Sequence, residues 1–249
     1  MSYERLSWDS EFFGVGIGRV DLGDLGDLGD LGDPAPAALA ALAAIDDLAR
    51  ADGVSCLYAS VDPADVAATI QLQQAGYLLV EVALDLRHPT SRLARTPDTT
   101  AVVRTGTPDD LEPLSPLLDR LAPWSRYAVD PRFGAEAARR MQAAWAARAA
   151  GPDPDRFLLV SEDDGEIVGF CTGSTFQGEL PRIDLIATTR PGREVAEGLV
   201  DARFAGFPLG SSMGGPIAAR NIASLRFVLG MGYGVATCRY MFHKWLDEA

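Results

Sequence analysis

The sequence predicts an α/β (α+β) protein of two similar lobes, each with a mixed central sheet flanked by helices. Two observations predict this class. Short apolar strands alternate with helical stretches along the chain. A strand–helix–strand pattern also occurs twice with one spacing: Asp65 lies 11 residues before a Gly-Tyr pair, and Asn221 lies 11 residues before another. This repeat predicts a lobe over residues 1–92 and a second, complete lobe over residues 100–249.

Composition excludes several classes of function. The chain has 249 residues, 47% of them hydrophobic, and a formal net charge of −13. This charge argues against nucleic acid and against an anionic membrane surface as partners, because both attract clustered Lys and Arg. No uncharged apolar run approaches the roughly 18 residues of a membrane span. The first residues lack a signal-peptide pattern, and three widely spaced cysteines form no metal or disulfide motif, so we expect a cytoplasmic protein without a metal.

The first lobe contains a low-complexity stretch. Residues 21–33 read DLGDLGDLGDLGD, a period that does not fit a calcium loop, whose ligands fall mostly at alternate positions. Its glycines break helix and strand alike, so we expect a flexible surface loop. A helix over 36–53, a strand over 54–61, a helix over 62–76 and a strand over 78–88 are expected to follow.

The second lobe follows a polar linker, HPTSRLARTPDTT, at residues 88–100. Its apolar segments and turn residues predict strands and helices in the order of a complete α/β domain. The expected segments are a strand at 100–106, helices at 107–122 and 130–151, a hairpin at 156–176, a strand at 181–189, a helix at 192–206, a strand at 207–215, a helix at 220–233 and a strand at 234–246.

Three stretches, together with this order of elements, resemble the GNAT acyltransferase superfamily and, within it, the TDP-fucosamine acetyltransferase family. They are LSWDSEFFGVGIGRV at 6–20, SRYAVDPRF at 125–133, and NIASLRFVLGMGY at 221–233 with YMFHKW at 240–245. The first stretch is similar to a signature of that family, whereas the last is general to GNAT folds. The family has a degenerate N-terminal lobe and a catalytic C-terminal lobe, in agreement with the repeat.

The resemblance implies acetyl-CoA or another acyl-CoA as co-substrate. In the superfamily the acyl-pantetheine arm lies between two parted strands, and the pyrophosphate rests on the start of the next helix, where free N–H groups and the helix dipole attract anions. A small-molecule amine, in this family an amino sugar linked to a nucleotide, attacks the thioester. The cofactor-binding positions that the resemblance implies are Leu185, Ile186, Ala187, Arg193, Ala196 and Asn221.

The pyrophosphate loop departs from the family pattern, Gln/Arg-x-x-Gly-x-Gly/Ala. The aligned residues are Pro191, Glu194 and Ala196, and only Ala196 fits. Proline removes an N–H donor, and unpaired like charges about 4 Å apart repel by ~1–4 kcal/mol, depending on the local dielectric. Arg190 or Arg193 could supply compensating charge. The sequence therefore predicts a degenerate coenzyme A site.

The catalytic groups also depart from the family. Its tyrosine acid falls seven residues after the asparagine, and that position is Val228, which cannot donate a proton. We expect Asp184 as the base, with an ion pair to Arg182 as the alternative. Tyr240 and His243 are further candidates for proton transfer, and packing in the core is the alternative for both.

The segment SRYAVDPR supplies the expected substrate contacts. These are Arg126, Tyr127, Asp130 and Arg132, whose guanidinium groups could hold a nucleotide diphosphate in a bidentate manner. The alternative is a structural turn in which Asp130-Pro131 starts a helix.

Three functions remain open from the sequence. The first is a GNAT N-acyltransferase acting on an amino sugar or another small amine. The second is an enzyme that does not use coenzyme A and carries out an elimination, cyclisation or decarboxylation on the same scaffold. The third is a non-catalytic binding protein. A strand edge at the lobe junction would suit a homodimer.

Overall fold

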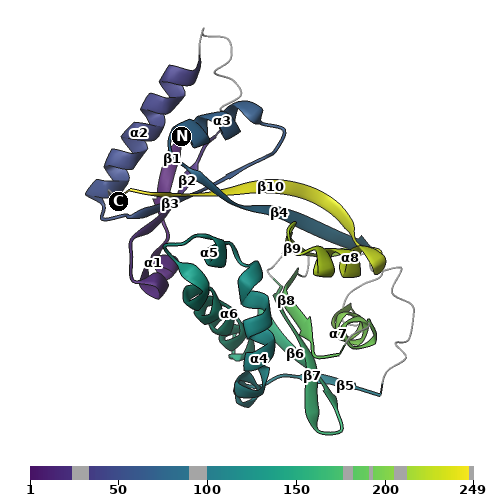
Figure 1. Ribbon diagram of the computed structural model, residues 1–249. Helices are drawn as coiled ribbons and strands as arrows, with labels where there is room; N and C mark the ends of the chain where they lie inside the picture. The colour runs from purple at the N-terminus through teal and green to yellow at the C-terminus, as the bar shows by residue number, and fades with distance from the viewer. Residues whose placement is uncertain (24–33, 90–99, 176–181, 191–192, 205–211, 247–249) are drawn as a thin grey trace. The chain divides into compact units, whose positions relative to one another are not determined.

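The computed structural model describes residues 1–23, 34–89, 100–175, 182–190, 193–204 and 212–246. Ten strands form one mixed sheet in the order β1-β2-β3-β10-β4-β9-β8-β7-β6-β5 (Figure 1). This confirms the predicted mixed α/β class. Residues 24–33 of the repeat loop, the linker at 90–99 and residues 205–211 lie outside the described part, and the expectations for them stay predictions.

From residue 34 on, the helices and strands follow the order that the sequence predicts, except for a short helix at 126–129 that was not expected, and no element was predicted before residue 22. The strands are β1 Ser2–Arg5, β2 Ile17–Asp21, β3 Cys56–Val61, β4 Leu78–Pro89, β5 Val102–Thr105, β6 Arg156–Asp163, β7 Glu166–Ser174, β8 Arg182–Thr188, β9 Ser212–Ala218 and β10 Gly234–Trp245. The helices are α1 Ser7–Phe13, α2 Pro34–Ala51, α3 Val66–Gln74, α4 Leu111–Leu121, α5 Arg126–Val129, α6 Gly134–Ala150, α7 Glu194–Phe204 and α8 Ile222–Gly230, with short 3₁₀ turns η3 Pro108–Asp110 and η4 Ala122–Trp124.

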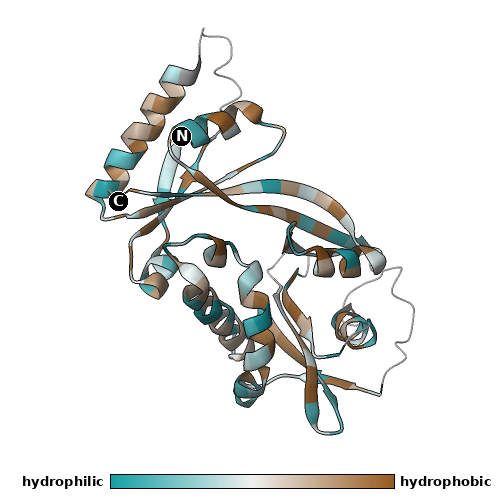
Figure 2. Cartoon of the chain, in the orientation of Figure 1, coloured by the Kyte–Doolittle hydropathy of each residue, from teal (hydrophilic) through white to brown (hydrophobic). Residues whose placement is uncertain are grey.

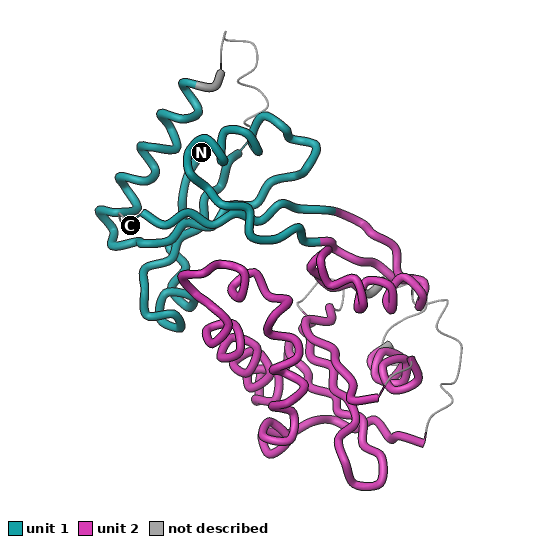
Figure 3. The backbone as a smooth tube through the Cα atoms, viewed as in Figure 1, with its two compact units in different colours: residues 1–83, 238–249 teal, residues 84–237 magenta. Residues whose placement is uncertain are grey.

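The chain divides into two compact units, coloured separately in Figure 3. Unit 1 comprises residues 1–83 and 238–249, and unit 2 comprises residues 84–237. Strands β4 and β10 therefore contribute residues to both. In the sheet, β10 lies beside β3 and β4 lies beside β9, so each repeat places its last strand next to the first strand of the other repeat. This exchange of strands involves residues far apart in the chain.

The strand–helix–strand repeat has the same caps in both copies. Asp65 is the N-cap of α3 and Asn221 is the N-cap of α8, and each side chain accepts a hydrogen bond from the N–H three residues later, at 2.9 and 3.2 Å. Gly76 and Gly232 follow the two helices with φ of 85° and 96°, a conformation that favours glycine. The equal spacing in the sequence therefore reflects two equally built helices.

The core of unit 1 lies between its helices and strands. In α2, the buried residues Ala38, Leu42, Ile45 and Ala49 are spaced four, three and four residues apart and so share one face. This face packs in one cluster with β3, α3 and the end of β10, where Phe242 is fully buried. The apolar face of a helix thus accounts for the docking of α2.

Unit 2 has a hydrophobic cluster on each face of its part of the sheet. One cluster joins α4 and α6 to Leu158, Phe170 and Leu185 on β6, β7 and β8. The other joins Leu199 of α7 to Cys171 on the opposite face of β7. Figure 1 shows α4 and α6 on one side of these strands and α7 on the other, and Figure 2 shows how apolar the strands are.

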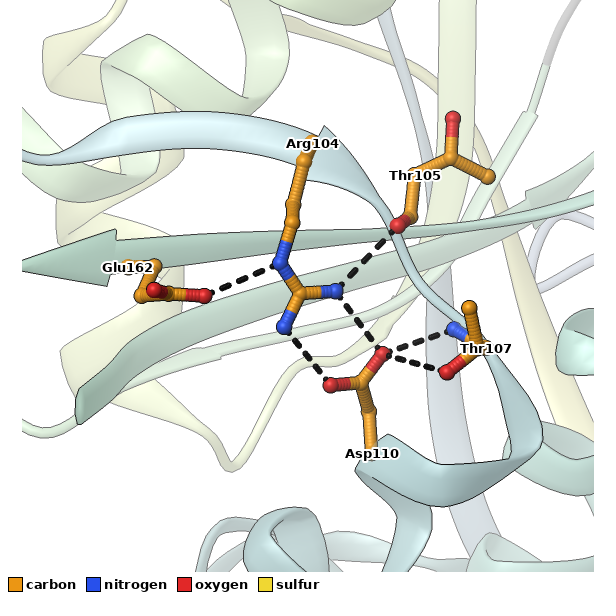
Figure 4. Close-up of polar contacts among 5 residues, drawn as sticks. All are labelled: Arg104, Thr105, Thr107, Asp110 and Glu162. Carbon is orange, nitrogen blue, oxygen red and sulfur yellow. Dashed lines mark hydrogen bonds and ion pairs between the residues drawn. The ribbon is translucent and has the colours of Figure 1, made fainter. Parts of the chain in front are cut away.

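The start of α4 is fixed to the edge strand β5 by an ion-pair network (Figure 4). Arg104 binds both carboxylate oxygens of Asp110, at 2.8 and 2.9 Å, and its Nε donates to Glu162 at 2.9 Å. The backbone N–H of Thr107 donates to Asp110 at 2.7 Å, which closes a capping box. These bonds, the one with Arg104 foremost, lower the pKa of Asp110 to about 2.

Candidate active site

Strands β8 and β9 run parallel but stay paired only where they begin. In the described residues their register is given by a single pair, Arg182 with Gly214. Two positions beyond Gly214, where the ladder would continue, β9 has Pro216. Proline has no N–H to donate, so the ladder cannot continue through it. The later part of β8 is thus left without a neighbour on this side.

Two glycines allow β9 to approach both neighbouring strands before it leaves β8. A Cβ at Gly214 would lie 2.4 Å from the carbonyl oxygen of Leu86, and a Cβ at Gly215 would lie 2.2 Å from that of Ile183. No side chain fits at such distances. The sequence Gly-Gly-Pro therefore gives a tight contact followed at once by an interruption of the ladder.

The open edge of β8 is the side of residues 185–188 that faces away from β7. On the β7 side, the N–H of Thr189 donates to the carbonyl of Val168 at 2.8 Å. Backbone groups alternate in direction along an antiparallel ladder, so those of Ala187 and Leu185 also point to β7. The N–H and C=O of Ile186 then point to the open edge. Of the three residues expected to bind the pantetheine arm, Ile186 has the suitable direction.

Asp184 lies where the open edge begins. Leu185 pairs with Thr172 and Ile183 pairs with Gly173, so Asp184 is the extra residue of a β-bulge. Bulges change the direction of a side chain and are frequent next to active sites. Asp184 is half-buried and accepts a hydrogen bond from Arg182 Nε at 2.9 Å.

The environment of this carboxylate has opposing effects on its pKa. Burial raises the pKa of Asp184 above its usual value, and the charge and hydrogen bond of Arg182 oppose this rise. The ion pair that we considered as the alternative is therefore present. A carboxylate with a raised pKa is also a better proton acceptor than an exposed one, so the pair and a role as base are compatible.

The start of α7, where a pyrophosphate would rest, is acidic. Helix α7 begins at Glu194, which is exposed, and Glu197 lies in the same first turn. Two carboxylates at a helix N-terminus suit the helix dipole, and they disfavour a second anion at the same place. Pro191, the other departure from the family loop, lies outside the described residues.

The two arginines expected to supply compensating charge have other partners. Arg190 forms an ion pair with Asp163 at 2.5 Å. Arg193 Nη1 donates to the carbonyl of Gly230 at 2.9 Å, at the C-terminal end of α8. Both groups would have to leave these partners, or share them, to bind a diphosphate.

The remaining cofactor positions have structural roles. Ala196 is buried in α7, and Asn221 caps α8 as described above. Val228, at the position of the family's tyrosine, is half-buried in α8 and offers no proton.

Tyr240 and His243 belong to unit 1, whereas Asp184 belongs to unit 2. Tyr240 packs against the core of unit 1, and His243 is 2% exposed and stacks on Tyr58 with ring centroids 4.5 Å apart. The structure therefore does not bring the three proposed catalytic residues together within either unit.

The four expected substrate contacts lie around α5. Tyr127 and Asp130 are buried, and Asp130 accepts a bond from the backbone N–H of Arg132 at 3.0 Å. Arg126 donates to the Tyr127 hydroxyl at 2.9 Å. Arg126 is half-buried and Arg132 is exposed, so these two have surface to offer to a ligand.

Two further arginines, which were not expected from the sequence, form hydrogen bonds near the open edge of β8 and near α5. Arg120 donates to the carbonyl of Thr188, and Arg220 donates to carbonyls in the segment after α4. A long side chain that reaches a distant carbonyl leaves no local pattern. Pro216, by contrast, left a local signal, because it directly follows the strand expected at 207–215 and a proline cannot continue a ladder.

No site for a metal is found in the part of the chain that the structure describes, where no three His, Cys, Asp or Glu side chains gather. None of its described helices is long and apolar enough to cross a membrane.

The comparisons with known proteins rest on structure. No protein-family model matches the chain, and no curated protein sequence does. Among solved structures, a tandem GNAT protein from the clavulanic acid biosynthesis pathway matches with a TM-score of 0.58 and 17% identity, over 95% of this chain and 77% of that one.

Two more structures match over nearly the whole chain. A GCN5-related N-acetyltransferase from Sphaerobacter thermophilus gives a TM-score of 0.59 and 16% identity, over 99% of this chain and 77% of that one. A conserved protein of unknown function from Staphylococcus epidermidis gives 0.63 and 12%, over 93% and 84%. The chain therefore has the fold of the tandem GNAT structures.

Proposed function

We propose that the protein is a GNAT-type acyltransferase that binds acyl-CoA along the open edge of β8 and transfers the acyl group to an amine of a small metabolite. The parting of β8 and β9 after the Arg182–Gly214 pair carries this proposal. It leaves the peptide groups of Ile186 facing an empty strand position. The pantetheine arm contains two amides in an extended chain, so it can occupy that position as an added strand does.

The chemistry follows from the place of Asp184 at the start of that edge. The amine nitrogen attacks the thioester carbon, a C–N bond forms, and the C–S bond breaks to release the thiolate. Asp184 accepts the proton that the nitrogen loses, and the proton then returns to the thiolate. Much of the rate enhancement comes from holding the amine and the thioester next to each other in the right orientation. The fixed positions of β8 and β9 would provide this orientation.

We further propose an anionic acceptor, such as a nucleotide-linked amino sugar. Arg126 and Arg132 support this, since they have accessible surface in a chain whose net charge is −13. Guanidinium groups bind diphosphates with two parallel hydrogen bonds, and a strongly acidic protein needs such local groups to attract an anion.

An enzyme that does not use coenzyme A is the second candidate, and the acidic start of α7 favours it. Glu194 and Glu197 lie in the first turn, and Arg190 and Arg193 have partners elsewhere. In this case the same fold and the same Asp184 would serve an elimination, cyclisation or decarboxylation without an acyl donor.

Calorimetric titration with acetyl-CoA and free coenzyme A separates the two candidates. We expect saturable binding by the native protein and tighter binding by Glu194→Gly, because the variant loses a negative charge at the diphosphate position. Glu166→Gln removes an exposed carboxylate from the start of β7 and serves as the control. Binding by Glu194→Gly alone would favour the second candidate, and no binding by either protein would contradict acyl transfer from coenzyme A.

A further inference from the structure

We infer that Arg120 and Arg220 are positioning residues that together hold β8 and β9 at a fixed separation where the open edge of β8 ends. The use of that separation for an acyl-CoA rests on the proposed function. That the two arginines hold the strands apart does not rest on the proposed function, and it can be tested without any ligand.

The first contact joins α4 to β8. Arg120 lies in the last turn of α4, and its Nη1 donates to the carbonyl oxygen of Thr188 at 3.1 Å. Thr188 is the last residue of β8. Its backbone groups follow the same alternation as those of Ile186, so this carbonyl points to the open edge. Arg120 therefore binds β8 on the side that β9 has left.

The second contact joins β9 to the segment after α4. Arg220 lies between the end of β9 and Asn221, the N-cap of α8. Its Nη1 donates to the carbonyl of Pro123 at 3.1 Å, and its Nη2 donates to that of Ser125 at 2.8 Å. Two bonds from two nitrogens of one planar group fix its orientation, which a single bond would not do.

The two contacts meet at one end of α4. The turn η4, which contains Pro123, directly follows α4, and Arg120 lies in the last turn of that helix. Because β8 and β9 are parallel, Thr188 and Arg220 both lie at the ends where the strands have parted. One arginine thus connects this end of α4 to β8, and the other connects β9 to it. The strands exchange no register pair there in the described residues, so their separation is set through α4.

Helix α4 is also held in place at its other end. The network around Arg104 and Asp110 holds the start of the helix to β5. A helix attached at its start and at its end transmits the position of the sheet to the parted strands. A rigid opening avoids part of the ordering cost when a ligand binds, because the strands need not be brought into place.

Hydrogen–deuterium exchange on the free protein tests whether the two arginines hold these strands in place. In Arg220→Ala and in Arg120→Ala we expect faster exchange in peptides covering residues 185–190 and 122–126, and unchanged exchange in the β6–β7 hairpin. Arg139→Ala removes an exposed arginine of α6 that pairs with Glu136, and it should change neither region. Unchanged exchange at 185–190 in both variants would overturn the inference, as would a uniform increase across unit 2.

Ligand binding then tests what the separation is used for. Loss of charged hydrogen bonds should weaken acetyl-CoA binding by about tenfold in Arg220→Ala, with part of the affinity restored in Arg220→Lys. The two alanine substitutions should be less than additive, because they disturb one arrangement. An unchanged dissociation constant would overturn the positioning role. If the native protein binds no acetyl-CoA, the proposed function fails, and the exchange result still decides the inference.

Discussion

The carbonyl oxygen of Ile183 occupies the place that a side chain on Gly215 would need, since a Cβ there would lie 2.2 Å away. This contact between β8 and β9 comes immediately before Pro216, and beyond it the strands part. The opening on which the proposed function depends therefore results from three consecutive residues of β9, which are Gly214, Gly215 and Pro216.

Gly215→Ala should destabilise the protein. Backbone atoms cannot yield as a flexible side chain does, so the added methyl must displace one strand, at a cost of about 1–3 kcal/mol in the free energy of unfolding. Urea denaturation measures this cost. Gly234→Ala is the matched control, because nothing lies within 4 Å of its Cβ position. Equal stability of the two variants would mean that the contact carries no strain.

Asp184→Asn should abolish catalysis without loss of stability. We expect kcat to fall by about 10²–10⁴-fold, the usual contribution of a general base, while acetyl-CoA affinity stays the same. Burial disfavours the charged form of Asp184 in the folded state, so the amide should leave the free energy of unfolding at pH 7 unchanged or higher. Asp119→Asn, an exposed position on α4, is the control. A variant that retains full kcat would remove Asp184 from the mechanism.

The pH dependence of the rate has a definite direction. The base must be deprotonated, and its folded-state pKa is raised by burial, so kcat should fall as the pH is lowered through that raised pKa. The descending limb should therefore lie above the ordinary value for Asp, which is about 3.9. A rate that stays constant down to that pH would contradict the assignment.

Asp110→Asn should destabilise the protein at neutral pH and have little effect in acid. The folded-state pKa of Asp110 is about 2, below its usual value, so its contribution is present above the unfolded pKa and is lost as the pH falls through the folded one. We expect a loss of about 1–3 kcal/mol at pH 7 that disappears towards pH 2. Denaturation curves at several pH values test this, with the exposed pair Glu136–Arg139 as control through Glu136→Gln.

His243→Phe separates packing from catalysis. The ring stacks on Tyr58 in unit 1, so we expect a lower melting temperature and, well below it, a kcat within about twofold of the native value. A loss of two orders of magnitude in kcat with an intact fold would return His243 to the active site.

The sequence predicted those features that depend on neighbouring residues. The equal spacing of Asp65 and Asn221 from the glycines that follow their helices is local, so it was sufficient to predict two equivalent helices. The expected start of the first helix at residue 62 was wrong, because its N-cap is Asp65. The exchange of β4 and β10 between the repeats was not predictable, because it depends on pairing between residues more than a hundred positions apart.

The candidate site shows the same limit. The expected strand at Asp184 exists, but the bulge that changes the direction of its side chain follows from the register with β7. The partners of Arg190 and Arg193 were equally hidden, since a flexible cationic side chain binds whichever acceptor the fold brings near. Sequence alone supplied the residue types, and the pairing of strands decided which of them face the open edge.

The most direct test of the account is the amide signal of Ile186 in protein labelled with ¹⁵N-isoleucine, followed by NMR as acetyl-CoA is added. If the pantetheine arm occupies the open edge of β8, the Ile186 signal should shift in a saturable manner and its hydrogen exchange should slow. The signals of Ile17 and Ile45, buried in unit 1, should stay in place. An Ile186 signal that does not change up to millimolar acetyl-CoA would contradict the proposed function.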